Sequence, residues 1–266
     1  MVGAKRSLGQ HFLASEAVVR RMIESCRFMA SQARGIVEVG PGRGALTGGL
    51  AALGKPLWLV ELDDALGADL ARRFPEARLS VADARTFDWH SLSRISGLFP
   101  WFLVGNLPYN AGTEILRQAL ASRETLVGMV VMLQREVAAK FCAGAGEGGY
   151  GPLAAWADPW WDRRILFGVP PGAFAPAPKV TSAVCAFQAR SVPGLPSGTM
   201  WSYWDFLQGA FRHPRKTLAS NLSDGHGEMR ERWIAVLGRL GHPPSVRPAQ
   251  VNPEDLARLY AHGPSG

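Results

Sequence analysis

Three closely spaced glycines are the residues in this sequence that most clearly suggest a ligand site. Gly40, Gly42 and Gly44 follow a buried-strand pattern at Ile36–Val39, and the apolar residues from Ala45 onward recur at helical spacing. Glycine allows a tight turn and a close approach of the backbone to a ligand. We therefore expect a helix that begins inside the glycine run, with its N–H groups turned toward a nucleotide-like ligand. Because glycine turns are common, this motif alone is weak evidence.

Two carboxylates end the next two strand patterns. Leu57–Val60 runs into Glu61, about twenty residues beyond the glycines, where a nucleotide-binding fold of this kind carries its ribose-binding acid. Leu79–Ala82 runs into Asp83, whose carboxylate could accept a hydrogen bond from an adenine amino group. An isolated Asp is more often a cap or turn residue. The spacing of Glu61 predicts a nucleoside cofactor without saying which one.

A fourth strand pattern, Trp101–Val104, runs into the stretch Gly-Asn-Leu-Pro-Tyr-Asn at residues 105–110. By itself this stretch is typical of an ordinary turn. Asn106 nevertheless stands at a strand end, as the glycine turn and the two carboxylates do. Ligands of parallel sheets bind at the carboxyl ends of the strands, so the shared position favours a functional role.

The elements that must position these residues alternate between strand and helix. A fifth strand pattern at Leu126–Leu133 follows a helical one, and helices are expected over 65–74 and from 115 to 120. Such alternation predicts an α/β fold with a doubly wound parallel sheet. Further along the chain, two more β-like runs, 164–167 and 183–187, flank a proline-rich segment.

That segment, Val169–Val180, is expected to form a stiff extended loop that holds Phe174 out at its middle. Residues 191–199 have the composition of a linker, and the pattern beyond them is helical. We therefore expect a ligand-binding α/β domain over 1–190, a linker over 191–199 and an all-α domain over 200–266.

Composition limits the classes of function. The chain has 266 residues, a formal net charge of +7 and a sequence pI of about 9.8, which favours a polyanionic partner. No apolar run reaches membrane-spanning length, and the N-terminus lacks the apolar core of a signal peptide. The three cysteines lie far apart, which suits reduced thiols and offers no zinc site. We expect a cytoplasmic protein without a bound metal.

Taken together, these motifs resemble the ribosomal RNA adenine dimethyltransferases of the KsgA type, which use S-adenosylmethionine. The resemblance runs from Leu8 to about Tyr260. Its most specific parts are the Asn-Leu-Pro-Tyr signature and the proline-loop motif, which covers Pro170–Ser182. Its other segments are Leu8–Leu13, Glu38–Thr47, Val60–Asp63, Asp83–Ala84, Leu133–Val137, Tyr150–Leu153 and Phe211–Leu222. It implies a Rossmann-like class I S-adenosylmethionine-dependent methyltransferase sheet followed by a small helical RNA-recognition domain.

The resemblance also implies a set of site residues. Glu61 would accept hydrogen bonds from both ribose hydroxyls, and Asp83 would accept one from the adenine amino group. The remaining cofactor contacts implied are Gln10, His11, Leu13, Gly40, Gly42, Gly44 and Asn106. The chain departs from the family pattern in three places: His11 stands where Asn is usual, Trp160 and Trp161 stand where tyrosines are usual, and His213–Pro214 interrupts a basic run.

For catalysis, the resemblance points to the Asn-Leu-Pro-Tyr segment. The Asn106 side-chain oxygen and the Leu107 carbonyl would accept the N–H bonds of the target adenine amino group, so that its nitrogen can pyramidalise toward the methyl donor. Tyr109 and Phe174 would stack on the target base. The implied substrate is small-subunit rRNA, within an assembling 30S particle, and a monomer is expected. Phosphate contacts are expected from Lys5, Arg6, Lys179, Arg212, Arg215 and Lys216.

Three other functions remain open from the residues. A nicotinamide-dependent dehydrogenase would share the glycine turn and Glu61, but it would leave the Asn-Leu-Pro-Tyr segment unexplained. A non-enzymatic nucleic-acid binder, like the related mitochondrial transcription factors, would not need an intact site. The related antibiotic-resistance methylases act on large-subunit rRNA, and here the matches in the proline loop and the C-terminal region favour the small-subunit type.

Overall fold

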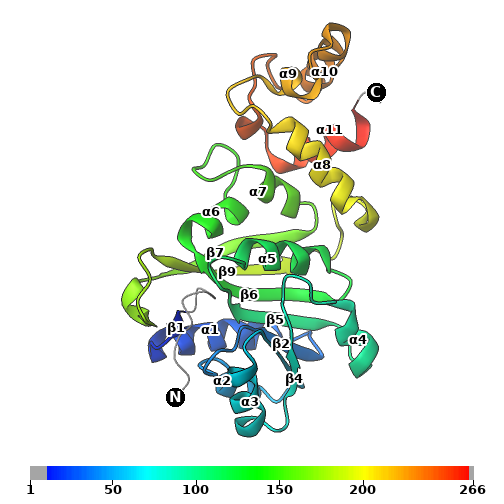
Figure 1. Cartoon of the computed structure of the whole chain (residues 1–266). Helices are drawn as coiled ribbons and strands as arrows, with labels where there is room; N and C mark the ends of the chain where they lie inside the picture. The colour runs from blue at the N-terminus through cyan, green and yellow to red at the C-terminus, as the bar shows by residue number, and fades with distance from the viewer. Residues whose placement is uncertain (1–10, 264–266) are drawn as a thin grey trace. The chain divides into compact units, whose positions relative to one another are not determined.

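A seven-stranded sheet organises the part of the chain that carries the predicted strands (Figure 1). The computed structural model describes residues 11–263. The strand order is β4-β3-β2-β5-β6-β9-β7. The strands are β2 (Gly35–Val39), β3 (Leu57–Glu61), β4 (Arg78–Val81), β5 (Trp101–Asn106), β6 (Leu126–Gln134), β7 (Trp161–Val169) and β9 (Ser182–Ala189).

The first five of these strands pair in parallel, as the alternating pattern predicts. The sheet is nevertheless mixed, because β9 runs antiparallel to β6, with Gln134 opposite Ser182. The α/β class is therefore confirmed, and the expectation of a parallel sheet holds only for its first five strands. As a result of this pairing, β9 begins at the edge where β5 and β6 end.

The helices that precede, connect or follow the strands β2 to β6 along the chain are α1 (Glu16–Met29), α2 (Thr47–Ala51), α3 (Asp64–Arg73), α4 (His90–Ser96), α5 (Gly112–Ala121) and α6 (Arg135–Cys142). Met22 and Cys26 on the buried side of α1 join strand residues such as Ile36 and Phe102 in one core cluster. Full burial of such apolar side chains stabilises the fold by about 1.5–3 kcal/mol each. This core fixes the strand ends from which the polar side chains project.

A second, two-stranded sheet pairs β1 (Phe12–Leu13) antiparallel with β8 (Phe174–Ala175). Leu13 lies opposite Phe174, and the N–H of Ala14 donates to the Ala173 carbonyl at 2.8 Å. This pairing buries Phe174, which is only 5% exposed. The expectation that the proline loop holds Phe174 out is therefore wrong: the loop folds back on the chain that precedes α1.

The chain divides into two compact units whose limits differ from the predicted boundary. One unit extends to Ala138 and includes Arg163–Ala189, whereas Ala139–Asp162 belongs with the residues from Arg190 onward. The second unit contains α7 (Pro152–Ala157), α8 (Met200–Ala210), α9 (Leu218–Leu222), α10 (Gly227–Arg239) and α11 (Pro253–His262).

Two hydrogen bonds explain why residues 139–162 belong to the helical unit. The Trp156 indole donates to the Met200 carbonyl at 2.9 Å, and the Tyr150 hydroxyl donates to the Val251 carbonyl at 2.8 Å. Trp160 and Trp161 are fully buried. The helical unit therefore draws one of its helices, α7, from a segment that precedes β7.

Candidate active site

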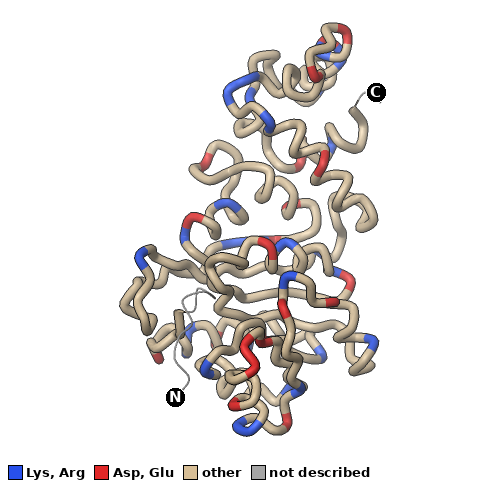
Figure 2. Tube along the Cα trace, in the orientation of Figure 1, with Lys and Arg blue, Asp and Glu red and all other residues tan. Residues whose placement is uncertain are grey.

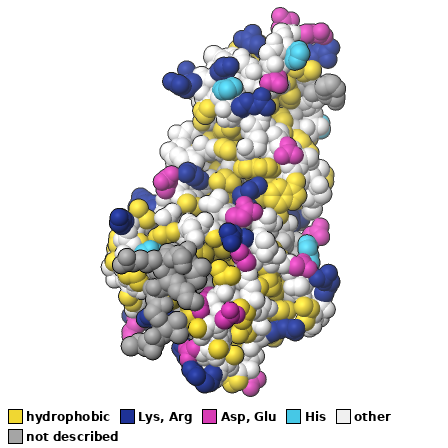
Figure 3. All heavy atoms as spheres, in the orientation of Figure 1, with side chains coloured by type: hydrophobic (Ala, Val, Ile, Leu, Met, Phe, Trp, Pro, Cys, Tyr) yellow, Lys and Arg dark blue, Asp and Glu magenta, His cyan; other side chains and the backbone are white. Residues whose placement is uncertain are grey.

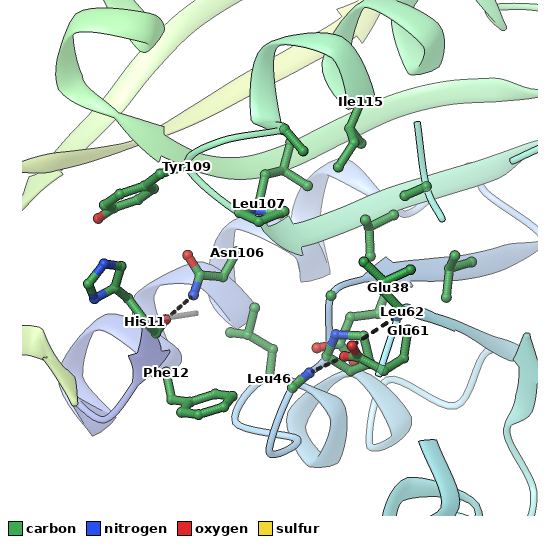
Figure 4. A pocket seen from close by; sticks show the side chains of 18 of the residues that line it. His11, Phe12, Glu38, Leu46, Glu61, Leu62, Asn106, Leu107, Tyr109 and Ile115 are labelled. Atoms are coloured by element: carbon green, nitrogen blue, oxygen red, sulfur yellow. Dashed lines mark hydrogen bonds between the residues drawn. The ribbon is translucent and has the colours of Figure 1, made fainter. Parts of the chain in front are cut away.

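A cavity of about 380 Å³ opens at the carboxyl ends of β2, β3 and β5 (Figure 4). It is lined by the glycine turn, by the residues that follow β3 and β4, and by the Asn-Leu-Pro-Tyr segment. His11 and Leu13 line it from the N-terminal side. The structure therefore brings most of the predicted catalytic and cofactor-binding residues to one cavity, although Gly44 is not part of its lining. The size of the cavity suits a nucleoside-containing ligand.

The glycine turn adopts backbone angles that only glycine reaches without strain. The φ angles of Gly40, Gly42 and Gly44 are +63°, +55° and +77°, which confirms the tight turn. A Cβ on Gly42 would lie 3.1 Å from the Phe12 ring. The helix expected to begin inside the run starts only at Thr47, because the left-handed glycines cannot join it.

Glu61 lies at the end of β3 and is 5% exposed. Its Oε1 accepts the N–H groups of Leu62 and Asp63, at 2.9 and 3.0 Å, and its Oε2 accepts that of Gly42 at 2.9 Å. A carboxylate offers about four lone-pair positions. The carboxylate thus joins the glycine turn to the end of β3, and binding two ribose hydroxyls requires it to share or release a main-chain bond.

Asp83 is tied to an arginine that the sequence patterns did not single out. Arg85 donates to its two carboxylate oxygens through Nε, at 3.1 and 2.9 Å, and through Nη2, at 2.5 Å. The Arg85 side chain holds the pKa of Asp83 below its usual range, so the carboxyl stays ionised. Both residues line the cavity, as does Leu62, whose side chain is 48% exposed.

A second buried carboxylate, Glu38 in β2, lies behind the glycine turn and lines the same cavity. Thr47 Oγ1 donates to Glu38 Oε2 at 2.7 Å. Burial raises the pKa of Glu38 to about 8, against the lowering effect of the Thr47 bond and with a smaller raising effect of Glu61. The sequence motif contained Glu38, yet nothing in its spacing indicated a raised pKa.

Asn106 ends β5 with its side chain held by the chain segment that precedes β1. Its Nδ2 donates to the His11 carbonyl at 3.0 Å. Because a carbonyl only accepts hydrogen bonds, this contact fixes which end of the amide is nitrogen. Figure 4 shows the Asn106 oxygen directed away from that bond, toward Tyr109. An oriented acceptor therefore stands at the edge of the cavity.

Tyr109 stands beside Asn106 and is anchored at its hydroxyl. The phenol oxygen lies 2.5 Å from Ser182 Oγ, at the start of β9. Burial raises the pKa of Tyr109, partly offset by the Ser182 bond. The His11 ring lies 5.2 Å from the Tyr109 ring, with an interplanar angle of 34°. Sequence reasoning had not assigned Ser182 a function, although it lies in the proline-loop motif.

Some predicted site residues lie away from the cavity or outside the described part of the chain. Phe174 does not line the cavity, and Lys179 is exposed. Lys5, Arg6 and Gln10 lie outside the described residues, so their predicted contacts remain predictions.

The basic cluster expected to contact RNA lies in the turn between α8 and α9, coloured blue in Figure 2. Arg215 and Lys216 are exposed there. Arg212 is also exposed but pairs with Asp224 at 2.8 Å. Figure 3 shows dark blue side chains gathered near α9 on the face it draws. Arg215 and Lys216 are therefore the stronger candidates for phosphate contacts.

Residues 11–263 contain neither a metal-binding cluster nor a membrane-spanning helix. Within that range, no group of three His, Cys, Asp or Glu side chains is placed to hold a metal ion. None of the described helices has the length and apolarity that crossing a membrane requires.

A comparison with protein families shows to which family the chain belongs. Residues 1–239 match the model of the ribosomal RNA adenine dimethylase family. The chain belongs to this family. The resemblance inferred from the motifs is thus confirmed, as are the enzyme class and the cofactor: the protein is an S-adenosylmethionine-dependent rRNA adenine dimethyltransferase.

Individual relatives agree with this family. The chain is 34% identical to ribosomal RNA small subunit methyltransferase A of Maridesulfovibrio salexigens, over 97% of this chain and 94% of the relative. It is 36% identical to the protein of the same name from Syntrophotalea carbinolica, over 96% of this chain and 95% of the relative. A crystal structure of the 23S rRNA methyltransferase ErmE matches with a TM-score of 0.74 at 24% identity, covering 94% of this chain and 98% of that one. At this identity the last match supports the fold alone.

Proposed function

We propose that this dimethylase transfers methyl groups to the N6 amino groups of two adjacent adenosines near the 3′ end of small-subunit rRNA, giving N6,N6-dimethyladenosine. The names of its relatives support the small-subunit substrate. The observation that carries the chemistry is the oriented Asn106 amide beside Tyr109 at the rim of the cavity. We also propose that the protein acts as a cytoplasmic monomer on an assembling 30S particle.

The residues of the cavity fit S-adenosylmethionine. Gly40 and Gly42 line the cavity without side chains, Glu61 offers a carboxylate for a ribose, and Leu62 offers an exposed apolar side chain for an adenine ring. The cofactor supplies an electrophilic methyl group on a sulfonium. The Asp83 carboxylate would accept a hydrogen bond from the adenine amino group, and Arg85 keeps that carboxylate ionised. His11 and Leu13 would close the cavity from the N-terminal side, with Gln10 as the predicted neighbour.

The chemical work of the protein is to orient a poor nucleophile. The lone pair of an adenine amino group is delocalised into the ring, and it becomes available when the nitrogen pyramidalises. The Asn106 oxygen and the Leu107 carbonyl would accept the two N–H bonds and favour that geometry. The bond from Asn106 Nδ2 to the His11 carbonyl prepares the amide for this task before substrate arrives. Tyr109 would stack on the base once it has left its helix.

Phe174 needs a different role from the one first expected. Its side chain is 5% exposed and pairs with β1 in the small sheet. Stacking on the target base would require β8 to separate from β1. We propose that Tyr109 is the main stacking residue and that Phe174 chiefly holds the proline loop against the N-terminal segment.

RNA recognition is proposed for the helical region 200–266 and for the edges of the catalytic region. Arg215 and Lys216 would contact phosphates. Arg212 would have to give up its ion pair with Asp224 before it could contact a phosphate. Lys179 is exposed on the proline loop and would contribute from the catalytic side, together with the predicted contacts of Lys5 and Arg6.

A large-subunit substrate is the main alternative. The fold match to ErmE is compatible with it, but the relatives that are at least 34% identical over nearly the whole chain carry the small-subunit name. Mapping of methylated adenines in rRNA from a strain without the gene separates the two. We expect two adjacent dimethyladenosines to be lost from small-subunit rRNA. Loss from large-subunit rRNA instead would refute the proposal.

A further inference from the structure

Tyr109 is held at two points by residues from outside its own loop. Its hydroxyl lies 2.5 Å from Ser182 Oγ, and Ser182 is fully buried. Its ring packs against the His11 ring, with the two centroids 5.2 Å apart (Figure 4). Because burial raises the pKa of Tyr109, the phenol keeps its hydrogen. The orientation of the ring is therefore set by contacts beyond the Asn-Leu-Pro-Tyr segment.

Ser182 provides a rigid reference point for the Tyr109 hydroxyl. It begins β9, pairs with Gln134 at the end of β6, and thus stands at the edge of the sheet where β5 ends. The N–H of Arg135 donates to the Thr181 carbonyl at 3.0 Å, which continues the pairing beyond the strands. The serine is consequently held by the pairing of β9 with β6.

His11 is itself fixed. Its Nδ1 lies 2.8 Å from the Pro176 carbonyl oxygen, and since a carbonyl only accepts, Nδ1 must carry a hydrogen. The His11 carbonyl receives the bond from Asn106 Nδ2. One residue thus contacts the proline loop through its ring nitrogen, Tyr109 through its ring face and Asn106 through its backbone.

We propose that Ser182 and His11 are positioning residues that clamp the Tyr109 ring, and that this clamp matters most for the second methyl transfer. The inference rests on the proposed role of Tyr109 as the stacking platform for the target base. The monomethylated base has one N–H and more bulk, so fewer of its orientations direct the nitrogen lone pair at the methyl donor. A ring free to tilt would hold that base in unproductive orientations, whereas the unmethylated base tolerates more of them.

A double-mutant cycle on the hydroxyl pair tests the clamp. Ser182→Ala, Tyr109→Phe and the combined variant are compared in single-turnover methylation of unmethylated small-subunit particles at saturating cofactor, with mono- and dimethyladenine quantified. We expect each single variant to lower the ratio of the second to the first rate roughly three- to tenfold, as for the loss of one hydrogen bond. The combined variant should be no worse than either single variant, because all three lack the same bond. Cofactor affinity should stay at the wild-type value.

Two further variants complete this test. Ser122→Ala removes another buried serine hydroxyl of the same unit, which bonds to the Gln118 carbonyl. It should leave the ratio unchanged. His11→Ala should shift the products toward monomethyladenine, as Ser182→Ala does.

The outcomes distinguish the clamp from the proposed function beneath it. If Tyr109→Ala methylates as well as wild type, the stacking role itself is wrong. If Tyr109→Ala is impaired while Ser182→Ala and Tyr109→Phe keep the wild-type ratio, the clamp is wrong. Additive effects in the combined variant, or equal slowing of both transfers, would also overturn it. Should Ser182→Ala fail to fold, Tyr109→Phe removes the same bond from the other side.

Discussion

Replacing Glu61 with Gln tests the cofactor site with the smallest change in shape. In the wild-type protein Oε1 accepts the N–H groups of Leu62 and Asp63, and the amide oxygen of Gln can keep both bonds. The new amide nitrogen then takes the place of Oε2 and faces the Gly42 N–H, which is also a donor. Losing one hydrogen bond to a charged acceptor costs about 1.5–3 kcal/mol, so we expect the free energy of unfolding to fall by about that amount. The loss of a carboxylate acceptor for the ribose hydroxyls should weaken cofactor binding by a similar free energy, roughly 10- to 150-fold in Kd.

Both quantities can be measured on the same preparations. Calorimetric titration with S-adenosylmethionine and with S-adenosylhomocysteine gives Kd, and urea unfolding gives the free energy of unfolding. Because the two ligands share the ribose, Glu61→Gln should weaken both to the same extent. Glu76→Gln makes the same chemical change at an exposed position after α3 and should alter neither measurement. A folded Glu61→Gln protein that binds both ligands with wild-type affinity would refute the assignment of Glu61 to the ribose.

Three further predictions concern pH, RNA and catalysis. The raised pKa of Glu38, about 8, means that the folded protein binds more protons than the unfolded chain between about pH 4.5 and 8. The free energy of unfolding should therefore fall as pH rises through that window, by at most about 1.4 kcal/mol per pH unit. Urea unfolding at several pH values should show a weaker pH dependence for Glu38→Gln than for the wild type. The same pH dependence in both proteins would contradict this prediction. Replacing Arg215 and Lys216 with Gln should lower the slope of log RNA affinity against log salt by roughly 0.7–0.9 per lost phosphate contact, with cofactor affinity unchanged; an unchanged slope would mean that the pair is only a solvated surface. Asn106→Ala should reduce the single-turnover methylation rate about 10²–10³-fold and RNA affinity far less, because its contact strengthens toward the transition state; a rate within about tenfold of wild type would show that another group orients the amino nitrogen.

Strand ends were the part of this site that sequence could predict. Strand periodicity and the two acids that follow strands predict the edge of the sheet, and Glu61 and Asp83 do line the cavity there. The glycine spacing predicts a tight turn, which the positive φ angles confirm. These features depend on local chain geometry, so a local pattern carries the information.

Contacts between distant segments were beyond the same reasoning. The pairing of β1 with β8 buries Phe174, although its proline-rich surroundings favoured an exposed position. The bonds from Tyr109 to Ser182 and from Asn106 to His11 join residues far apart in the chain. The grouping of residues 139–162 with the C-terminal helices likewise depends on tertiary hydrogen bonds. The periodicity of apolar residues cannot predict such contacts, because each one depends on how the folded chain brings distant segments together.

The most direct test of the central claim is methylation of unmethylated small-subunit particles by the purified protein with labelled S-adenosylmethionine, followed by mapping of the modified nucleotides. Large-subunit particles in parallel give the matched control. We predict two adjacent N6,N6-dimethyladenosines near the 3′ end of the small-subunit rRNA and no label in the large subunit. Label confined to large-subunit rRNA, or absent from both particles, would contradict the account.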